Sequence, residues 1–307
     1  MALQFLTYQN IDKEKWDNCV QNAENSLIYG YSFYLDAMAE TWDGIVLDDY
    51  EAVMPLPWRK KWGIAYLYQP AFIQQGGIYF SGELPTAIIN DFLSLVLAHF
   101  KFAEFTLNYA NLTSNLPGWD VTERNNFVLP LNQHYDIISG GYQPAINKSI
   151  KRASKHDPVY EVSINYVEVL QLYKSLYHAR LPYFSDEDFE NFAGICKQCI
   201  SRGNLIVRQV SAKDSKEILA AVILLKDRER LYNMVSCITP EGRRIEINYF
   251  LYDQLIREFC NSAYYLDFEG SDVPGIAFFY QRFTNINQRY FYVKTNKLHP
   301  IIRLFKK

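Results

Sequence analysis

The sequence predicts an α/β protein of two domains that share one order of helices and strands. The chain has 307 residues, about twice the length of a common single domain. Hydrophobic residues make up 49% and charged residues 21%, as in ordinary globular proteins, which excludes a disordered or fibrous chain. Each half shows two helical patterns, a meander of strands, a long helix and a further strand. We therefore expect, in each half, a mixed and mostly antiparallel sheet flanked by helices.

The first half opens with LQFLTY, which is typical of a strand. Apolar residues at helical spacing then predict two helices, and short apolar runs between turn-forming or basic residues predict antiparallel strands. A long helix and two more strands follow. In order, these elements are expected at 11–23, 32–40, 44–47, 50–55, 64–68, 84–102, 103–110 and 121–131.

The second half repeats this order after a basic helical stretch. Its elements are expected at 143–156, 159–164, 167–179, 186–201, 204–210, 218–225, 231–238, 245–260, 263–268, 274–283 and 288–294. The boundary between the halves is expected in NQHYDIISGG, where polar residues and glycines gather. The predicted domains are residues 1–135 and 136–307.

Charge and terminal sequence restrict the location and the partners. The net charge of -3 and the pI near 6.0 argue against a general attraction to nucleic acid or acidic membranes. The start MALQFLTYQN has no basic segment followed by an apolar run, and no stretch approaches the length of an apolar membrane span. We therefore expect a cytoplasmic protein without a membrane span and without DNA as a partner.

Three motifs in the second half resemble those of one family. K-S-I-K-R-A at 148–153 is similar to the family's R-N-I-R-K-A helix, and D-F-E-G-S at 267–271 is similar to its D-F-x-G strand. PGIAFFYQRF followed by NINQRYFYV is similar to its G-x-x-x-F-K-x-x-F-G element and last strand. Together with the repeated order of elements, these motifs resemble the GNAT N-acyltransferase superfamily, in its FemABX-like branch with two such domains in tandem. Tyr280 stands where the family has lysine, and Phe283-Thr284 stands where it has Phe-Gly.

The resemblance implies an N-acyltransferase that passes an acyl or aminoacyl group to an amine by direct attack, assisted by a carboxylate. It implies acyl-CoA, such as acetyl-CoA, or aminoacyl-tRNA as the donor, and a small molecule or cell-wall precursor as the acceptor. The second domain would hold the donor and the catalytic groups. The first, with few candidate catalytic groups in matching places, would complete the acceptor side. A second hypothesis is a binding module for a phosphorylated ligand that has kept the fold and lost transfer.

Four cations lie along one face of the basic helix. Lys148, Lys151, Arg152 and Lys155 follow one another at helical spacing, so their charges repel. A phosphorylated ligand would relieve that repulsion, and Lys148, Lys151 and Arg152 are therefore candidate substrate-binding residues. A solvated helix face is the alternative.

A glycine and two arginines follow the last strand of the second meander. The resemblance implies that the donor's pyrophosphate binds backbone N–H groups at the start of the next helix. That segment here is T-P-E-G-R-R, so Gly242, Arg243 and Arg244 are candidate cofactor-binding residues, together with Ser236 on the strand before it. Glu241 would place a carboxylate where the phosphate should lie, and a plain helix start is the alternative.

Two carboxylates and two tyrosines complete the candidate site. Asp267 and Glu269 alternate on one strand, so both side chains share a face. Either carboxylate can accept a proton from an attacking amine, with Glu269 as the first choice, while the alternative is a cap for the helix that follows. Tyr280 is a catalytic candidate for protonating the leaving group, and Tyr232 is a candidate for binding substrate. Because the chain has 24 tyrosines, a core role is the alternative for each.

Overall fold

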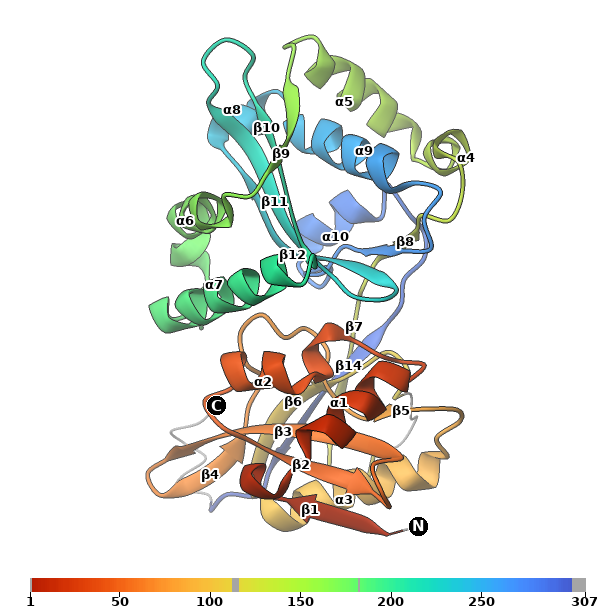
Figure 1. Ribbon diagram of the computed structural model, residues 1–307, viewed down its shortest axis with the longest axis vertical. Coiled ribbons are helices and arrows are strands. Elements are labelled where there is room, and N and C mark those ends of the chain that lie inside the picture. The colour runs from red at the N-terminus through yellow and green to blue at the C-terminus, as the bar shows by residue number, and fades with distance from the viewer. Residues whose placement is uncertain (1, 112–115, 182, 300–307) are drawn as a thin grey trace. The chain divides into compact units, whose positions relative to one another are not determined.

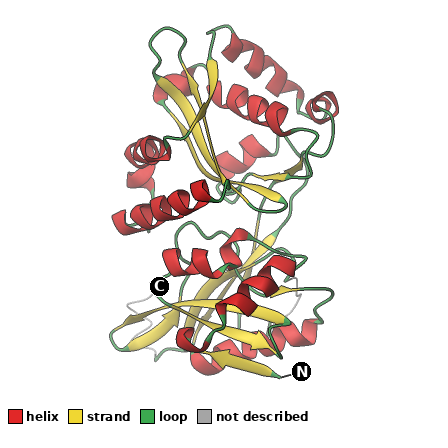
Figure 2. Ribbon diagram, in the orientation of Figure 1, coloured by secondary structure: helices red, strands yellow, loops and turns green. Residues whose placement is uncertain are grey.

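The computed structural model describes residues 2–111, 116–181 and 183–299. Helices cover strands in both halves of the chain (Figure 2), and each half has a mostly antiparallel sheet of its own. The predicted fold class is confirmed.

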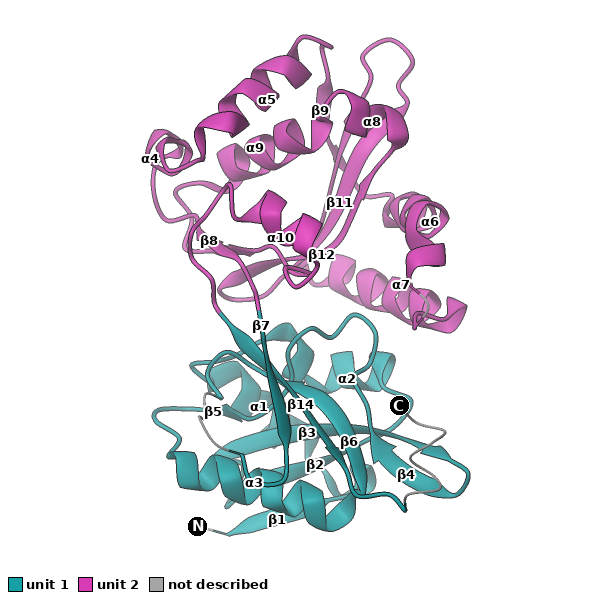
Figure 3. Cartoon of the chain, turned by 180° about the vertical axis from the view of Figure 1, so that it is seen from behind, with its two compact units in different colours: residues 1–124, 289–307 teal, residues 125–288 magenta. Residues whose placement is uncertain are grey.

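The chain divides into two compact units (Figure 3). Unit 1 comprises residues 1–124 with 289–307, and unit 2 comprises residues 125–288. The backbone therefore passes from unit 1 to unit 2 and later returns. The predicted domains, in contrast, met at a single boundary after residue 135.

Unit 1 contains an eight-stranded sheet in the order β1-β2-β3-β4-β6-β14-β7, with β5 paired to β3. Neighbouring strands are antiparallel except β4 and β6, which are parallel. The strands are β1 (Leu3–Leu6), β2 (Trp42–Leu47), β3 (Ala52–Lys61), β4 (Ile64–Leu67), β5 (Tyr79–Phe80), β6 (Phe102–Leu107), β7 (Asp120–Arg124) and β14 (Tyr290–Asn296).

The helices of unit 1 are α1 (Lys13–Asn22), α2 (Ser32–Met38) and α3 (Thr86–His99), with short turns η1 (Tyr8–Asn10) and η2 (Ile28–Gly30). Asp12 begins α1, because its side chain accepts hydrogen bonds from two backbone N–H groups of the first turn. Helix α3 buries an apolar stripe that includes Phe92 and Val96 against the sheet.

Unit 2 contains a six-stranded sheet in the order β8-β13-β12-β11-β10-β9. Only β12 and β13 are parallel. The strands are β8 (Val128–Pro130), β9 (Val159–Ser163), β10 (Leu205–Ser211), β11 (Ile218–Lys226), β12 (Arg230–Ile238) and β13 (Tyr265–Asp267).

Helices cover both faces of this second sheet (Figure 1). Helices α6 and α7 pack on one face, and α9, backed by α5, packs on the other. The helices are α4 (Tyr135–Gly140), α5 (Pro144–Ser154), α6 (Tyr166–Tyr177), η3 (His178–Arg180), α7 (Asp186–Ser201), α8 (Pro240–Arg244), α9 (Ile247–Phe259) and α10 (Pro274–Tyr280).

Two strands lie in a different half of the fold from the one predicted. The sequence pattern predicted one strand over 121–131, but the structure has two there, β7 in the sheet of unit 1 and β8 in the sheet of unit 2. The last strand, β14, returns to unit 1 and lies between β6 and β7. An alternating pattern gives the face that a strand buries but not its pairing partner, so periodicity could not predict which sheet β8 and β14 join.

Two further segments differ from the sequence-based expectation. The segment expected to link the domains contains helix α4, whose Ile138 is buried. The helix expected over 245–260 is preceded by a separate short helix, α8, because Glu246 adopts a left-handed backbone (φ 59°) that interrupts the spiral. In the described part of the chain, no helix is both long and apolar enough to cross a membrane.

Candidate functional site

Strands β12 and β13 form a fork in the sheet of unit 2. They pair only at Arg230 with Tyr265, Leu231 with Leu266, and Tyr232 with Asp267. Strand β12 continues to Ile238, whereas β13 ends at Asp267. Among the described residues, no strand pairs with this edge of β12 beyond Tyr232.

Asn233 lies where the two strands part. Its Nδ2 lies 3.1 Å from the carbonyl oxygen of Phe268, 2.7 Å from the hydroxyl of Tyr252 on α9, and 2.9 Å from the hydroxyl of Tyr280 on α10. The carbonyl can only accept, so it fixes which end of the amide faces it. Asn233 therefore joins the last paired residues of the fork to both helices on that face.

Aromatic rings pack around these hydroxyls and exclude water from them. The Tyr280 ring stacks on Phe268 with centroids 4.6 Å apart, and the Tyr252 ring lies edge-on to it at 5.7 Å. Burial raises the pKa of Tyr252, and it raises the pKa of Tyr280 well above the ordinary phenol value. Both phenols are therefore neutral at physiological pH and act as hydrogen-bond donors or acceptors rather than as bases.

A register shift in β12 aligns polar groups along its free edge. The shift lies between Ile223 and Leu224 of the partner strand, and beyond it the half-buried Ser236 lies within hydrogen-bonding reach of Tyr252. The N–H and C=O of Ile238 contact the Tyr177 hydroxyl, whereas the next N–H, that of Thr239, bonds back to β11. Because backbone groups alternate between the two edges of a strand, Ser236 presents its N–H and C=O to the same edge as Ile238.

The end of this edge is covered by Tyr177 and Arg243. The Arg243 Nη2 donates a hydrogen bond of 2.8 Å to the Tyr177 hydroxyl, and its guanidinium lies 5.5 Å from the centre of the tyrosine ring. Tyr177 comes from the last turn of α6, and Arg243 comes from α8. Arg243 is exposed, so its charge is open to a ligand.

The start of α8 is packed more tightly than a phosphate-binding turn requires. A Cβ atom at Gly242 would lie 2.3 Å from the carbonyl oxygen of Leu219, so glycine is needed there for close packing. The Gly242 N–H already bonds to the Thr239 side chain at 3.1 Å. Glu241 and Arg244 form an ion pair on the surface, which lowers the pKa of Glu241. Of the predicted phosphate ligands, Arg243 alone lies beside the edge of β12.

The two candidate carboxylates differ in their surroundings. Asp267 is fully buried and forms an ion pair of 2.8 Å with the buried Arg230, so it holds the base of the fork together. Glu269 follows β13 with a left-handed backbone (φ 53°) and is largely buried. Its chain neighbour Phe268 contacts Asn233, so Glu269 lies within one residue of the fork. Sparsely populated backbone conformations of this kind gather at functional sites.

The other predicted substrate-binding residues do not join the fork. Tyr232 is fully buried, and its hydroxyl bonds to Asp227 in the turn before β12. Lys148 and Lys151 are exposed on α5, where Arg152 forms an ion pair of 2.7 Å with Glu246. Helix α5 packs on α9, and its exposed lysines form a basic surface.

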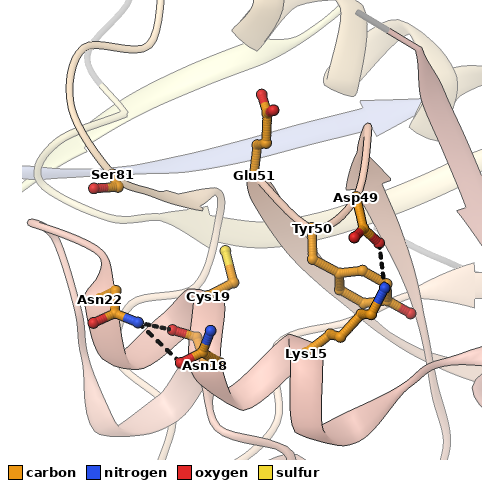
Figure 4. A pocket seen from close by; sticks show the side chains of 8 residues that line it. All are labelled: Lys15, Asn18, Cys19, Asn22, Asp49, Tyr50, Glu51 and Ser81. Carbon is orange, nitrogen blue, oxygen red and sulfur yellow. Dashed lines mark hydrogen bonds and ion pairs between the residues drawn. The ribbon is translucent and has the colours of Figure 1, made fainter.

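Unit 1 contains a surface pocket of about 390 Å³, and none of the predicted site residues lines it. Its walls come from α1, the β2–β3 turn and the residue after β5, as Figure 4 shows: Lys15, Asn18, Cys19, Asn22, Asp49, Tyr50, Glu51 and Ser81. Lys15 pairs with Asp49, and burial raises the pKa of the Cys19 thiol to about 11. The pocket therefore contains no activated nucleophile.

Three residues at the edge of β12 were not predicted from the sequence: Asn233, Tyr252 and Tyr177. Asn233 occupies a strand position that the apolar pattern of β12 assigns to the core, and a buried asparagine inside a strand is unusual enough to be a signal. The helical pattern of the sequence predicts ordinary core positions for Tyr252 and Tyr177. The three residues lie along one edge of β12 because β12 and β13 part there.

Residues 143–281 match a family model described as an acetyltransferase (GNAT) domain. This segment is a GNAT domain. It runs from the start of α5 into the residue after α10, so it includes the whole fork of β12 and β13. No curated protein matches the chain by sequence.

Solved structures extend the likeness beyond the GNAT domain to the whole chain. FemX is 12% identical, with 100% of both chains covered and a TM-score of 0.64. A conserved protein of unknown function from Bacteroides thetaiotaomicron is 11% identical, with 95% of this chain and 99% of that chain covered and a TM-score of 0.59. A tandem GNAT protein from the clavulanic acid biosynthesis pathway is 10% identical, with 97% and 99% covered and a TM-score of 0.54. The predicted resemblance is confirmed: the second unit carries a GNAT domain, and the whole chain has the fold of tandem GNAT proteins.

Proposed function

We propose that the GNAT domain is an N-acyltransferase whose donor lies along the free edge of β12 and reacts at the fork. The observation that carries this proposal is the fork itself, because β12 runs on from Tyr232 to Ile238 after losing its partner strand. A free strand edge binds an extended, amide-bearing chain through main-chain hydrogen bonds. An acyl-CoA, whose arm contains amides, fits this edge.

The reaction forms a C–N bond and breaks the bond between the acyl carbon and its carrier. A neutral amine attacks the acyl carbon, and Glu269 accepts the proton that the amine loses. Tyr280, a neutral phenol, donates a hydrogen bond to the carrier atom as negative charge develops on it. Asn233 and Tyr252 orient Tyr280, and Arg243 binds a phosphate of the carrier.

The acceptor is an amine, and the likeness to FemX favours an amine of the cell-wall-precursor type. Unit 1 does not bind the donor in this proposal, because its own chain fills the corresponding edge of its sheet. The segment after β4 bonds to β6 there, through the Gly76 N–H and the Gln69 side chain. Unit 1 is therefore the non-catalytic domain.

A second candidate function rests on the packing of α8. Thr239 already bonds to the Gly242 N–H, and Glu241 already pairs with Arg244, so the turn offers few free donors to a pyrophosphate. This observation favours either a binding module for a phosphorylated ligand or an aminoacyl-tRNA donor, whose phosphates would contact the basic face of α5. Replacing Lys148 and Lys151 by alanine would then weaken the binding of tRNA and leave the binding of acetyl-CoA unchanged.

The test is a transfer assay with acetyl-CoA and with aminoacyl-tRNA against a panel of amines. We expect the wild type to transfer from acetyl-CoA, and Glu269→Gln to lower kcat at least about 100-fold. Glu217→Gln, on the exposed hairpin after β10, is the matched control. Thermal stabilisation by either donor without transfer to any amine would favour the binding module instead.

A further inference from the structure

The end of β12 is held by a tyrosine from another element. The Ile238 N–H lies 3.3 Å from the Tyr177 hydroxyl, and that hydroxyl lies 3.5 Å from the Ile238 carbonyl oxygen. One phenol thus contacts both backbone groups that Ile238 presents to the free edge. An amide of a bound donor would need these same two groups.

Both contacts are long for hydrogen bonds that involve a backbone N–H or a hydroxyl, which centre near 2.9 Å and 2.8 Å. An amide that runs beside β12 can pair with the same groups at ordinary lengths, as a neighbouring strand does. The exchange therefore replaces two weak contacts by two better ones, and Tyr177 must move for it to occur.

Arg243 opposes this movement, because it donates its bond of 2.8 Å to the same hydroxyl. The arginine is exposed on α8, whereas Tyr177 is half-buried. A phosphate that attracts Arg243 would remove the strongest contact of the phenol. Release of Tyr177 and capture of a phosphate are thus linked through one side chain.

We infer that Tyr177 is a specificity-determining residue that occupies the donor's place on β12, and that Arg243 exchanges Tyr177 for a phosphate of the donor. This inference rests on the proposed function and deepens it, because it selects a donor with both an amide arm and a phosphate. A coenzyme A thioester has both, whereas the acyl-bearing end of a tRNA has no amide arm.

The test compares acetyl-CoA with S-acetylpantetheine, which has the amide arm without the phosphates. Tyr177→Phe removes the contacts with Ile238 and should lower KM for both donors about three- to tenfold, with kcat unchanged. Arg243→Ala should change KM for the two donors in opposite directions. KM for S-acetylpantetheine should fall, while KM for acetyl-CoA should rise at least about tenfold because a phosphate contact is lost. Tyr173→Phe is the matched control, since its ring lies next to that of Tyr177 in the same helix, 5.1 Å away.

Calorimetric binding of coenzyme A to the same variants separates this inference from the proposed function. If the wild type binds coenzyme A and transfers nothing, acyl transfer fails, and the Kd of Tyr177→Phe still decides the role of Tyr177. An unchanged or raised Kd and KM in Tyr177→Phe overturns the inference, as does a wild type that binds no coenzyme A or uses aminoacyl-tRNA alone. Arg243→Ala, a surface change, keeps the test valid if Tyr177→Phe does not fold.

Discussion

The forks in the two sheets differ in what lies along their free edges. In unit 1 the parallel strands β4 and β6 pair at Leu67 with Ala103, and the chain that leaves β4 meets β6 again further along. Gly76 forms a parallel bridge with Leu107. In unit 2, side chains lie along the edge of β12 in the described part of the chain: Asn233 contacts the Phe268 carbonyl oxygen at the fork, and Tyr177 contacts Ile238 at the end.

Amide side chains fix the segment of unit 1 between β4 and β5, residues 68–78, which is called the inserted segment below. Asn111 accepts a hydrogen bond of 2.6 Å from the Ile78 N–H, and Asn25, Asn108 and Asn111 all donate to the Ile78 carbonyl oxygen. All three asparagines are buried. The fork of unit 1 is therefore filled by its own chain and by amide side chains, whereas hydroxyl groups lie along the fork of unit 2. In the proposed function, the same fold thus serves as a scaffold in unit 1 and as a binding edge in unit 2.

The largest loss of stability is expected from a substitution in the inserted segment of unit 1. Gly77 has φ of 86°, and a Cβ atom there would lie 2.1 Å from the Asn111 Oδ1. Gly77→Ala should lower the free energy of unfolding by about 3 to 5 kcal/mol, through backbone strain and displacement of the amide network. Gly63→Ala is the control: φ is 79°, nothing lies within 4 Å of its Cβ, and about 1 kcal/mol is expected.

Tryptophan fluorescence during urea unfolding measures this difference, because all five tryptophans lie in unit 1. Hydrogen exchange in β10 to β12 reports on unit 2 and should change little in either variant. Equal losses for Gly77→Ala and Gly63→Ala would contradict the view that the segment is tightly enclosed.

The second prediction contrasts an asparagine from each fork. Asn111→Ala leaves the Ile78 N–H buried without its acceptor and should cost about 2 to 3 kcal/mol in unit 1, with kcat unchanged. Asn233→Ala removes the amide that bonds to Tyr280 and should lower kcat/KM at least about tenfold, beyond any loss of stability. The comparison would fail if Asn111→Ala reduced kcat as strongly as Asn233→Ala.

The third prediction concerns helix α10, which follows β13 in unit 2 and carries Tyr280. In the described part of unit 1, no helix follows the corresponding strand, β6. Tyr280→Phe keeps the ring stacked on Phe268 and removes only the hydroxyl, so kcat should fall about tenfold, equivalent to about 1.4 kcal/mol. KM for the donor should stay within about twofold. A fall in stability without a fall in kcat would make the hydroxyl purely structural.

The sequence alone predicted the fold class, and its element order located almost every helix and strand. Periodicity reports which side of an element is buried, so it found the segments that became β10, β11 and α7. It does not report which strands pair, because pairing depends on residues far apart in the chain. For that reason β14 was expected in the second domain and lies in unit 1.

The candidate site was predicted less completely for a related reason. Motif likeness pointed to Glu269 and Tyr280, and the segment that the resemblance implied for phosphate binding pointed to Arg243; these three lie at or beside the fork. Tyr232, a candidate that none of the motifs contains, has its side chain turned away from the Asn233 cluster and bonded to Asp227. Asn233 was missed because its role depends on the parting of two strands, which no local pattern in the sequence encodes.

The smallest expected effect is a difference in pH response between the forks. The network of unit 1 consists of amides, which do not titrate, whereas the turn before β12 contains the half-buried Asp227. Burial raises the pKa of Asp227 despite its bonds to Tyr232 and two backbone N–H groups. The folded protein therefore binds this proton more tightly than the unfolded chain does. The free energy of unfolding of unit 2 should fall as pH rises from about 3.9, the unfolded value, through the raised folded value.

Asp227→Asn keeps an acceptor for both N–H groups and removes the charge, so it should flatten this fall by an amount on the order of 1 kcal/mol. Burial also raises the pKa of Asp253 on α9, which gives a slope of the same sign, so some fall should remain in the variant. Exchange rates in β12 measured between pH 4 and pH 7 report the change. Burial also raises the pKa of Asp43 in unit 1, so tryptophan fluorescence should detect a fall of the same sign there, which Asp227→Asn should leave unchanged. A steeper fall in Asp227→Asn than in the wild type would mean that the charged carboxylate stabilises the turn, and the difference in pH response between the forks would then have the opposite sign.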